Sequence, residues 1–326
     1  MNPSPLPIRL AAAAVMLAAA VTACRPGPGE GVSDEPEGAP ERAGLPGYEG
    51  SEFCMACHPR QYDEWEGTLH ATTVRPPSES ERQLLRGTLL CGEFEPKYVL
   101  GQRHAKRFML ESDEEEGLHV LLPCRYDVAP ATWTNLHESE WRGMVWERSC
   151  GACHTTGFSS EDLGYAEIHV GCESCHGPAS RHGTFKETAG MIAFGRTGGI
   201  DEVMICASCH LQGGRSRKSG LNFAHNYEAG DDLFADYDFD WAQLDAQGED
   251  AENPIDVHQK IAIRDVVNPS GRMGDLELRC TSCHRSHTME HSVHETLPRD
   301  EYCHLCHARD DFKLKEYSQA CNVCEF

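Results

Sequence analysis

The stretch Cys150-Gly151-Ala152-Cys153-His154 decides the fold of this chain, because its Cys-x-x-Cys-His pattern occurs six times. Two thiols at this spacing can each add to one vinyl group of the same porphyrin, and the following histidine then supplies an imidazole to the iron. The pattern is typical of c-type haem attachment. The expected attachment cysteines are Cys54, Cys57, Cys150, Cys153, Cys172, Cys175, Cys206, Cys209, Cys280, Cys283, Cys303 and Cys306. The expected proximal ligands are His58, His154, His176, His210, His284 and His307.

Zinc is the main alternative cofactor, since paired Cys-x-x-Cys motifs also build zinc ribbons. A zinc ribbon does not need a histidine directly after the second cysteine, whereas six of the seven pairs in this chain have one. Histidine accounts for only 18 of 326 residues, so six such placements do not arise by chance. The set of motifs therefore favours haem.

The seventh pair, Cys321-Asn322-Val323-Cys324, is followed by Glu325 instead of histidine. It can be a decayed haem site, a disulfide, or a haem site whose ligand comes from elsewhere. We favour the first two, because a haem here lacks its adjacent proximal ligand. The sequence thus predicts six haem c groups and leaves a seventh in doubt.

The amino terminus has the features of an export signal. Arg9 precedes a short apolar run over residues 10–21, and small residues lead to Cys24. We expect residues 1–23 to be a signal peptide, Cys24 to be lipidated, and residues 24–48 to be a flexible linker, since they are rich in Pro, Gly and Glu. The alternative is an ordinary signal peptide with an incidental cysteine.

The expected location is the cell envelope, where c-type haem is attached. The apolar run is too short for a spanning helix, which needs about 20 residues. Arg25 after the lipidated cysteine favours the outer membrane, on its periplasmic face or at the cell surface. Cys91 and Cys124 belong to no motif, and a disulfide is the expected state outside the cytoplasm, with free buried thiols as the alternative.

The chain is strongly acidic, with a formal net charge of −23. This charge argues against nucleic acid as a partner, since nucleic-acid binding needs a basic surface. It favours redox partner proteins with basic patches, which electrostatic attraction would steer. A simply well-solvated acidic surface is the plainer explanation for most of the charge.

Between the first two motifs, short apolar runs at 97–100, 107–110 and 118–122 alternate with Gly and charged residues, which indicates a small β-meander at about 90–125. The rest of the domain, residues 49–326, is expected to be mainly α with much irregular structure. In this fold class, a multihaem cytochrome c, the chain wraps around a row of haems that form much of the core. Closely spaced motifs at 150–210 and 280–307 predict two haem clusters.

The remaining twelve histidines can supply sixth ligands to the irons. A second imidazole makes an iron suited to electron transfer, whereas an empty sixth position allows a substrate to bind. The strongest distal candidates are His70, His182, His258, His287 and His294. Weaker candidates are His104, His119, His137, His169, His225, His291 and His304.

The sequence around several motifs resembles the multihaem cytochromes of the cytochrome c-554 type, which include the tetrahaem electron acceptor of hydroxylamine oxidoreductase. The resemblance lies in residues 54–70 with Tyr62 and Trp65, residues 150–157, residues 170–178 with His182, and residues 283–287. It implies electron transfer through closely packed haems that mostly have two histidine ligands. The chain departs from the tetrahaem members in having six motifs, so their haem order cannot be copied.

Three functions remain open at this stage. The first and favoured one is electron transfer without substrate chemistry. The second is reduction or oxidation of a small nitrogen or sulfur compound at one haem with an open site, which needs nearby acid–base groups. The sequence has no Cys-x-x-Cys-Lys variant that would support a nitrite-reductase type of open haem. The third is a metal-binding or disulfide-stabilised interaction module.

Overall fold

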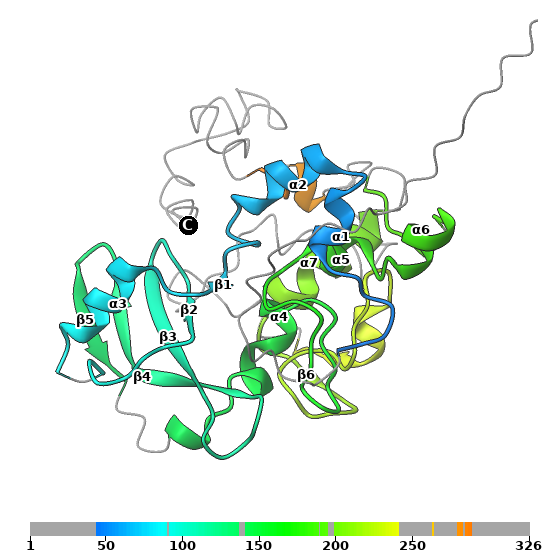
Figure 1. Cartoon of the computed structure of the whole chain (residues 1–326). Helices are drawn as coiled ribbons and strands as arrows, with labels where there is room; N and C mark the ends of the chain where they lie inside the picture. The colour runs from blue at the N-terminus through cyan, green and yellow to red at the C-terminus, as the bar shows by residue number, and fades with distance from the viewer. Residues whose placement is uncertain are drawn as a thin grey trace, which may run out of the picture. The chain divides into compact units, whose positions relative to one another are not determined.

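The computed structural model describes residues 44–89, 91–136, 141–188, 190–194, 199–240, 263, 279–282 and 284–288. Figure 1 traces the chain. The predicted signal peptide, Cys24, most of the linker, the sixth motif and the last cysteine pair lie outside the described residues. In the described part of the chain, no helix has the length and apolar character needed to cross a membrane.

The helices are short, and most of them carry or flank a haem motif. They are α1 (Ser51–Met55), α2 (Pro59–Glu66), α3 (Glu79–Arg86), α4 (Ala152–His154), α5 (Cys172–His176), α6 (Ser180–Phe185) and α7 (Gly199–His210). A 3₁₀ turn, η5 (Cys280–Ser282), carries the start of the fifth motif. Short helices suit the motif, because one helical turn already brings positions i, i+3 and i+4 onto one face.

A five-stranded antiparallel sheet forms between the first and second motifs. Its strands are β1 (Val74–Arg75), β2 (Tyr98–Leu100), β3 (Ala105–Glu111), β4 (His119–Asp127) and β5 (Thr132–Asn135), and they neighbour one another in chain order. The predicted β-meander is therefore present, although its strands span 74–135 and not only 90–125. In Figure 1 these strands occupy one side, α1, α2, α5, α6 and α7 the other, and α4 lies between them.

The two faces of this sheet have different partners, because successive side chains along a strand point to opposite sides. On one face, Val99, Phe108 and Leu122 pack with Leu85 of α3 in a fully buried cluster. The disulfide between Cys91 and Cys124 belongs to this cluster, so the expected pairing of these cysteines is confirmed.

On the opposite face of the sheet, Tyr98 and Met109 pack with Trp146 and with Cys150, the first cysteine of the second motif. The sheet therefore forms one wall around the second motif.

A separate core surrounds α7. Val203, Met204 and Ala207 of α7 pack with Leu233 and Tyr237 from the segment that follows. That segment contains the 3₁₀ turn η3 (Leu233–Ala235) and a two-stranded sheet of β6 (Arg215–Ser216) and β7 (Tyr237–Asp238). The Tyr237 hydroxyl donates to the Leu211 carbonyl at 2.8 Å and accepts from the Gly214 amide at 2.9 Å, which fixes the chain as it leaves α7.

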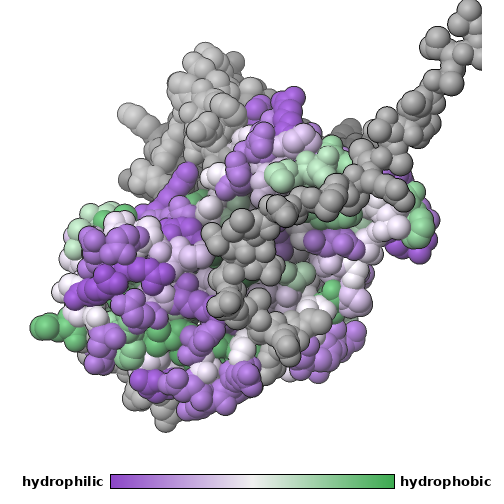
Figure 2. Space-filling model, viewed as in Figure 1, coloured by the Kyte–Doolittle hydropathy of each residue, from purple (hydrophilic) through white to green (hydrophobic). Residues whose placement is uncertain are grey.

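The fold is mixed, and the expectation of a mainly α chain is not confirmed. The longest strand, β4, has nine residues, whereas α4 has three and α5 has five. The haem motifs need only one helical turn each, so six motifs do not make a helical protein. The expectation of extensive irregular structure agrees with the long connections between these elements. Most of the surface in Figure 2 is hydrophilic, in line with the high net charge.

Candidate haem centres

Each of the first four motifs adopts a helical turn that gathers its two cysteines and its histidine, and the fifth begins in a 3₁₀ turn. In the first motif the amide of His58 donates to the carbonyl of Cys54 at 2.9 Å. In the fifth, the amide of His284 donates to the carbonyl of Cys280 at the same distance. This i to i+4 bond places the first cysteine and the histidine one turn apart, which is the geometry that covalent haem attachment needs.

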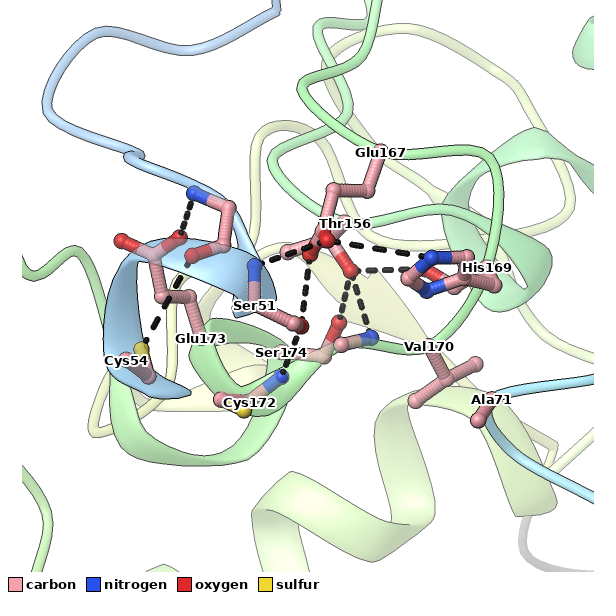
Figure 3. A network of polar contacts seen from close by, with 12 residues as sticks. Ser51, Cys54, Ala71, Thr156, Glu167, His169, Val170, Cys172, Glu173 and Ser174 are labelled. Carbon is pink, nitrogen blue, oxygen red and sulfur yellow. Dashed lines mark hydrogen bonds and ion pairs between the residues drawn. The ribbon is translucent and has the colours of Figure 1, made fainter. Parts of the chain in front are cut away.

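The first and third motifs lie against each other through the carboxylate of Glu173 (Figure 3), which follows Cys172 in the sequence. This buried carboxylate accepts the backbone amides of Glu49 at 3.0 Å, Gly50 at 2.8 Å and Ala179 at 2.7 Å. It therefore ties the start of α1 and the start of α6 to the third motif. Burial raises the pKa of Glu173.

A second carboxylate, Glu167, extends this connection (Figure 3). It accepts the amide of Ser51 at 2.7 Å and its hydroxyl at 2.9 Å, while the same hydroxyl accepts the amide of Cys172 at 3.1 Å. Gly171 permits this approach, because a Cβ there would lie 2.1 Å from Glu167 Oε2. Burial also raises the pKa of Glu167. The Cys54 and Cys172 thiols are consequently within hydrogen-bonding reach.

The second and fourth motifs also touch. The Cys153 thiol contacts the Ser208 carbonyl at 3.9 Å, and the Cys209 thiol contacts the Ala152 carbonyl at 4.0 Å. Ser174 of the third motif lines the same small cavity as these residues. Small residues inside the motifs thus allow three motifs to meet.

The fifth motif joins α7 through one buried carboxylate. Glu202 of α7 accepts the amide of Thr281 at 2.7 Å. The Cys206 and Cys280 thiols lie within hydrogen-bonding reach of each other. Helix α7 therefore contacts both the second and the fifth motif.

Three proximal histidines face a second imidazole. The ring centres of His58 and His182 are 6.2 Å apart, those of His70 and His210 are 6.3 Å apart, and those of His176 and His287 are 6.0 Å apart. Two imidazoles on opposite sides of one metal ion, each with a metal–nitrogen distance of about 2 Å, hold their ring centres roughly 6 Å apart. The spacing of all three pairs fits an iron between the rings.

The protonation of these rings also fits haem iron. Nδ1 of His176 lies 2.7 Å from the Ile192 carbonyl, and Nδ1 of His182 lies 3.0 Å from the Glu187 carbonyl. A carbonyl only accepts, so each Nδ1 carries the proton and each Nε2 keeps the lone pair that binds a metal. Burial lowers the pKa of His70, which favours the neutral, metal-binding form.

His154 has a different setting. Its Nδ1 lies 2.9 Å from the Thr73 hydroxyl, and its ring centre lies 6.4 Å from that of Trp146. Within the described ranges, no other histidine ring lies as close to it as the partners of His58, His176 and His210 lie to theirs. Burial lowers the pKa of His154 to about 4, with contributions from His210 and His70.

The sequence predicted His119 only as a weaker candidate for a distal iron ligand, but the structure places it in a buried polar pair. It is fully buried, its Nδ1 lies 2.7 Å from Glu147 Oε1, and its Nε2 has no partner. The apolar strand pattern around His119 did not indicate this pair, because Glu147 lies far along the chain.

Several predicted site residues lie outside the described residues. They are the distal candidates His258 and His294, the proximal ligand His307, and the cysteines Cys283, Cys303 and Cys306.

The cysteines of the haem motifs, among the described residues, form no disulfide with one another. Among the described residues, no group of three or more His, Cys, Asp or Glu side chains is placed to hold a metal ion directly.

Comparison with known proteins agrees with this geometry. The family model described as cytochrome c554 and c-prime matches residues 53–89 and 131–177, on both sides of the central part of the sheet. The chain carries the attachment motifs of a multihaem c-type cytochrome, and the two matched stretches contain the first three of them. No curated protein matches it.

Two solved structures are similar to this cytochrome. The outer cell wall cytochrome OcwA has 18% sequence identity and a TM-score of 0.59, and the match covers 81% of this chain and 68% of OcwA. An undecahaem cytochrome from the S-layer of Carboxydothermus ferrireducens has 20% identity and a TM-score of 0.48. That match covers 83% of this chain but only 44% of the undecahaem protein.

Proposed function

We propose that this cytochrome carries electrons through a set of six closely spaced haem c groups, most of them with two histidine ligands. The three imidazole pairs at 6.0–6.3 Å carry this proposal. An iron with two imidazoles exchanges electrons without binding substrate, and its potential depends on axial ligands, burial and nearby charge. The protein's part is to fix the spacing of the haems and their surroundings.

In each proposed ligand pair the second histidine follows a different motif from the first. His182 follows the third motif and pairs with His58 of the first, while His70 follows the first motif and pairs with His210 of the fourth. His287 follows the fifth motif and pairs with His176 of the third. Each haem in this proposal bridges two distant segments, so the haems hold the chain together as well as conduct electrons.

The contacts between motifs support a branched order of haems. The first motif lies against the third through Glu173, and α7 with the fourth motif contacts both the second and the fifth. We infer that the haem of Cys206 and Cys209 is the junction from which electrons reach the haems on either side.

The wider setting follows from the sequence. We propose export, anchoring through a lipidated Cys24, and placement at the outer membrane or cell surface. The redox partners would be proteins with basic patches, attracted by the net charge of −23. The similarity to a cell wall cytochrome is compatible with this setting.

The experiment is a spectroscopic count of low-spin haems in the fully loaded protein. Replacing His182, His70 or His287 by Ala is expected to keep the covalent haem count at six while turning one low-spin haem into a high-spin haem in each variant. Electron paramagnetic resonance and intact mass measure the two quantities. His225→Gln is a matched control, because its ring pairs with Glu161 at 3.1 Å. Unchanged low-spin signals in all three Ala variants would contradict the ligand assignment.

The second candidate function is chemistry on a small molecule at one haem. The setting of His154 is the observation behind it, because its ring centre lies 6.4 Å from that of Trp146, and no imidazole in the described part of the chain pairs with it as in the other three. An iron with only one protein ligand can take up an external molecule. Cyanide or hydroxylamine binding to one haem of the native protein would support this function, and an entirely low-spin, unreactive protein would oppose it.

A further inference from the structure

We propose that the surface formed by α1 and α6 is the docking site for a redox protein with a basic rim, so that electrons pass between the two proteins at the haem of the first motif. The inference deepens the proposed function and rests on it, because it names where electrons cross the surface. This surface, the α1–α6 face, has an apolar centre and an acidic rim. The apolar centre consists of Phe53, Met55 and Phe185.

The three apolar side chains of this centre are exposed and close together. Phe53 is 45% exposed, Met55 is 43% exposed and Phe185 is 66% exposed. Helices α1 and α6 meet here (Figure 1), because a Cβ on Gly183 would lie 2.2 Å from Cε1 of Phe53. Met55 and Phe185 each follow one side of that contact by two residues. Exposed apolar residues scattered singly are ordinary, whereas a group of them indicates an interaction site.

The first motif presents to solvent the two residues between its cysteines. These positions lie away from the porphyrin, because the two cysteines and the histidine at i, i+3 and i+4 share one face of the helical turn. In the first motif they are Met55 and Ala56, and both are exposed. In the second, third and fourth motifs the residues at the same positions are buried or half-buried. A protein that contacts Met55 therefore comes within one helical turn of the first attachment site.

The same two helices also supply the imidazole pair proposed for the first haem. His58 ends the first motif, His182 lies in α6, and their ring centres are 6.2 Å apart. Phe53 contacts Gly183, the neighbour of His182, so α6 contributes to both the ligand pair and the docking surface. Electron tunnelling weakens steeply with distance, and a partner bound on this face is therefore placed to exchange electrons with the first haem.

The charges around the apolar centre define the partner. Residues 51–66 and 180–187 contain five acidic and three basic side chains. Arg60 and Arg181 are each held in an ion pair with a nearby glutamate, at 2.9 and 2.6 Å. The other charged side chains of these two ranges are Glu52, Asp63, Glu66 and Lys186, all of them exposed. A net negative rim fits a protein whose own apolar contact surface is surrounded by lysine or arginine.

A small apolar centre with a charged rim suits a short-lived complex. Electron-transfer complexes bury little surface, and opposite charges speed their encounter and orient the two proteins. The apolar contact then excludes water where the electron crosses. The partner that fits the α1–α6 face is therefore a protein electron carrier with a basic rim around its cofactor.

The test measures electron transfer from the fully loaded, reduced protein to an oxidised basic cytochrome c whose exposed haem edge is ringed by lysines. Stopped-flow absorbance gives the second-order rate constant. Phe185→Ser and Met55→Ser are each expected to lower it by about three- to ten-fold. Glu52→Gln is expected to lower it by about two-fold and to weaken its dependence on salt, because salt screens exposed charges.

Two matched controls lie elsewhere on the surface. Met144 is 51% exposed in the segment before the second motif, and Glu114 is exposed between β3 and β4. Met144→Ser and Glu114→Gln should keep the native rate constant. Haem count and low-spin signals should be native in every variant, so that a slower rate reports docking.

Two further oxidants separate docking from a change in the haems. Ferricyanide is a small anion that needs no docking surface, so every variant should reduce it at the native rate. The same basic cytochrome c with acetylated lysines should accept electrons more slowly from the native protein. With this oxidant Glu52→Gln should have almost no effect, because the complementary charge is gone.

The outcomes separate the hypotheses. Native rates for Phe185→Ser and Met55→Ser with the basic cytochrome c would overturn the docking site, while electron transfer itself stands. Equal slowing with ferricyanide would also overturn it, since the substitutions then act on the haems. If the native protein reduces neither oxidant, the proposed function fails and this inference with it. A native dimer that Phe185→Ser dissociates in sedimentation would show that the face binds a second copy, which contradicts the proposal.

Discussion

The first and second haem motifs have the same five-residue pattern in two different settings. Cys54–His58 lies against the third motif, is joined to it through the carboxylates of Glu173 and Glu167 at the start of α1, and has its histidine opposite His182. Cys150–His154 lies against the inserted sheet, where Nδ1 of His154 lies 2.9 Å from the Thr73 hydroxyl and the ring lies beside Trp146. The motif fixes attachment and one ligand, whereas the surrounding elements determine what meets the other side of the iron.

The two settings also differ in the interactions that stabilise them. Buried carboxylates that accept backbone amides join the first and third motifs, so their stability depends on a few polar groups. The sheet beside the second motif depends on an apolar layer and a disulfide. The following changes test this difference, beginning with the largest expected effect.

Replacing Glu173 by Ala should cause the largest loss of stability, at the contact between the first and third motifs. The buried amide of Ala179 and the part-buried amides of Glu49 and Gly50 lose their acceptor. An unsatisfied buried group costs about 1–3 kcal/mol, so the free energy of unfolding should fall by roughly 3 kcal/mol. Denaturant unfolding of the loaded protein measures this. Glu187→Ala is the control, because Glu187 forms a mostly exposed ion pair with Arg181 and should cost less than about 1 kcal/mol. Equal losses in the two variants would show that Glu173 does not hold the motifs together.

Removing the disulfide should weaken the second region. The double variant Cys91→Ala and Cys124→Ala opens a link between residues 33 positions apart, and such links contribute about 2–4 kcal/mol. Thermal unfolding followed by circular dichroism measures the loss. The low-spin signals assigned to the haems of His58 and His176 should remain as in the native protein. Their loss would mean that the two regions are not independent.

Acidification should produce the smallest effect, through Glu81 in the capping box of α3. Burial raises its pKa, but hydrogen bonds from Arg75, Lys106 and Ser78 outweigh burial and hold the pKa well below the ordinary value of 4.5. The unfolded chain then binds the proton more readily, so the stabilisation is present above about pH 4.5 and declines as the pH falls towards the native pKa. Native protein should be about 1 kcal/mol more stable than Glu81→Gln at pH 7.

Unfolding measurements at pH 7 and pH 3 check this sign. The gap between native protein and Glu81→Gln should shrink at the lower pH. A gap that grows on acidification would mean that the carboxylate destabilises the native state.

Some of the centre could be predicted from the sequence. The motifs predicted the attachment cysteines and proximal histidines, and short apolar runs predicted strands that are present as β2, β3 and β4. His70, His182 and His287 were among the favoured distal candidates, and each is now opposite a proximal ring. Their pairing could not be predicted, because each partner belongs to a different motif. The buried pair of His119 and Glu147 was missed because it depends on a contact between β4 and the segment before the second motif.

The sequence by itself determined that this is a haem protein, because thioether attachment and the proximal bond involve five consecutive residues. Only the tertiary structure decided which imidazoles face each other and which carboxylates join the motifs. The physical reason is that a sixth ligand or a buried hydrogen-bond acceptor is selected by distance in space. That distance depends on how the sheet, α6 and α7 pack, and the spacing of residues along the chain does not report it.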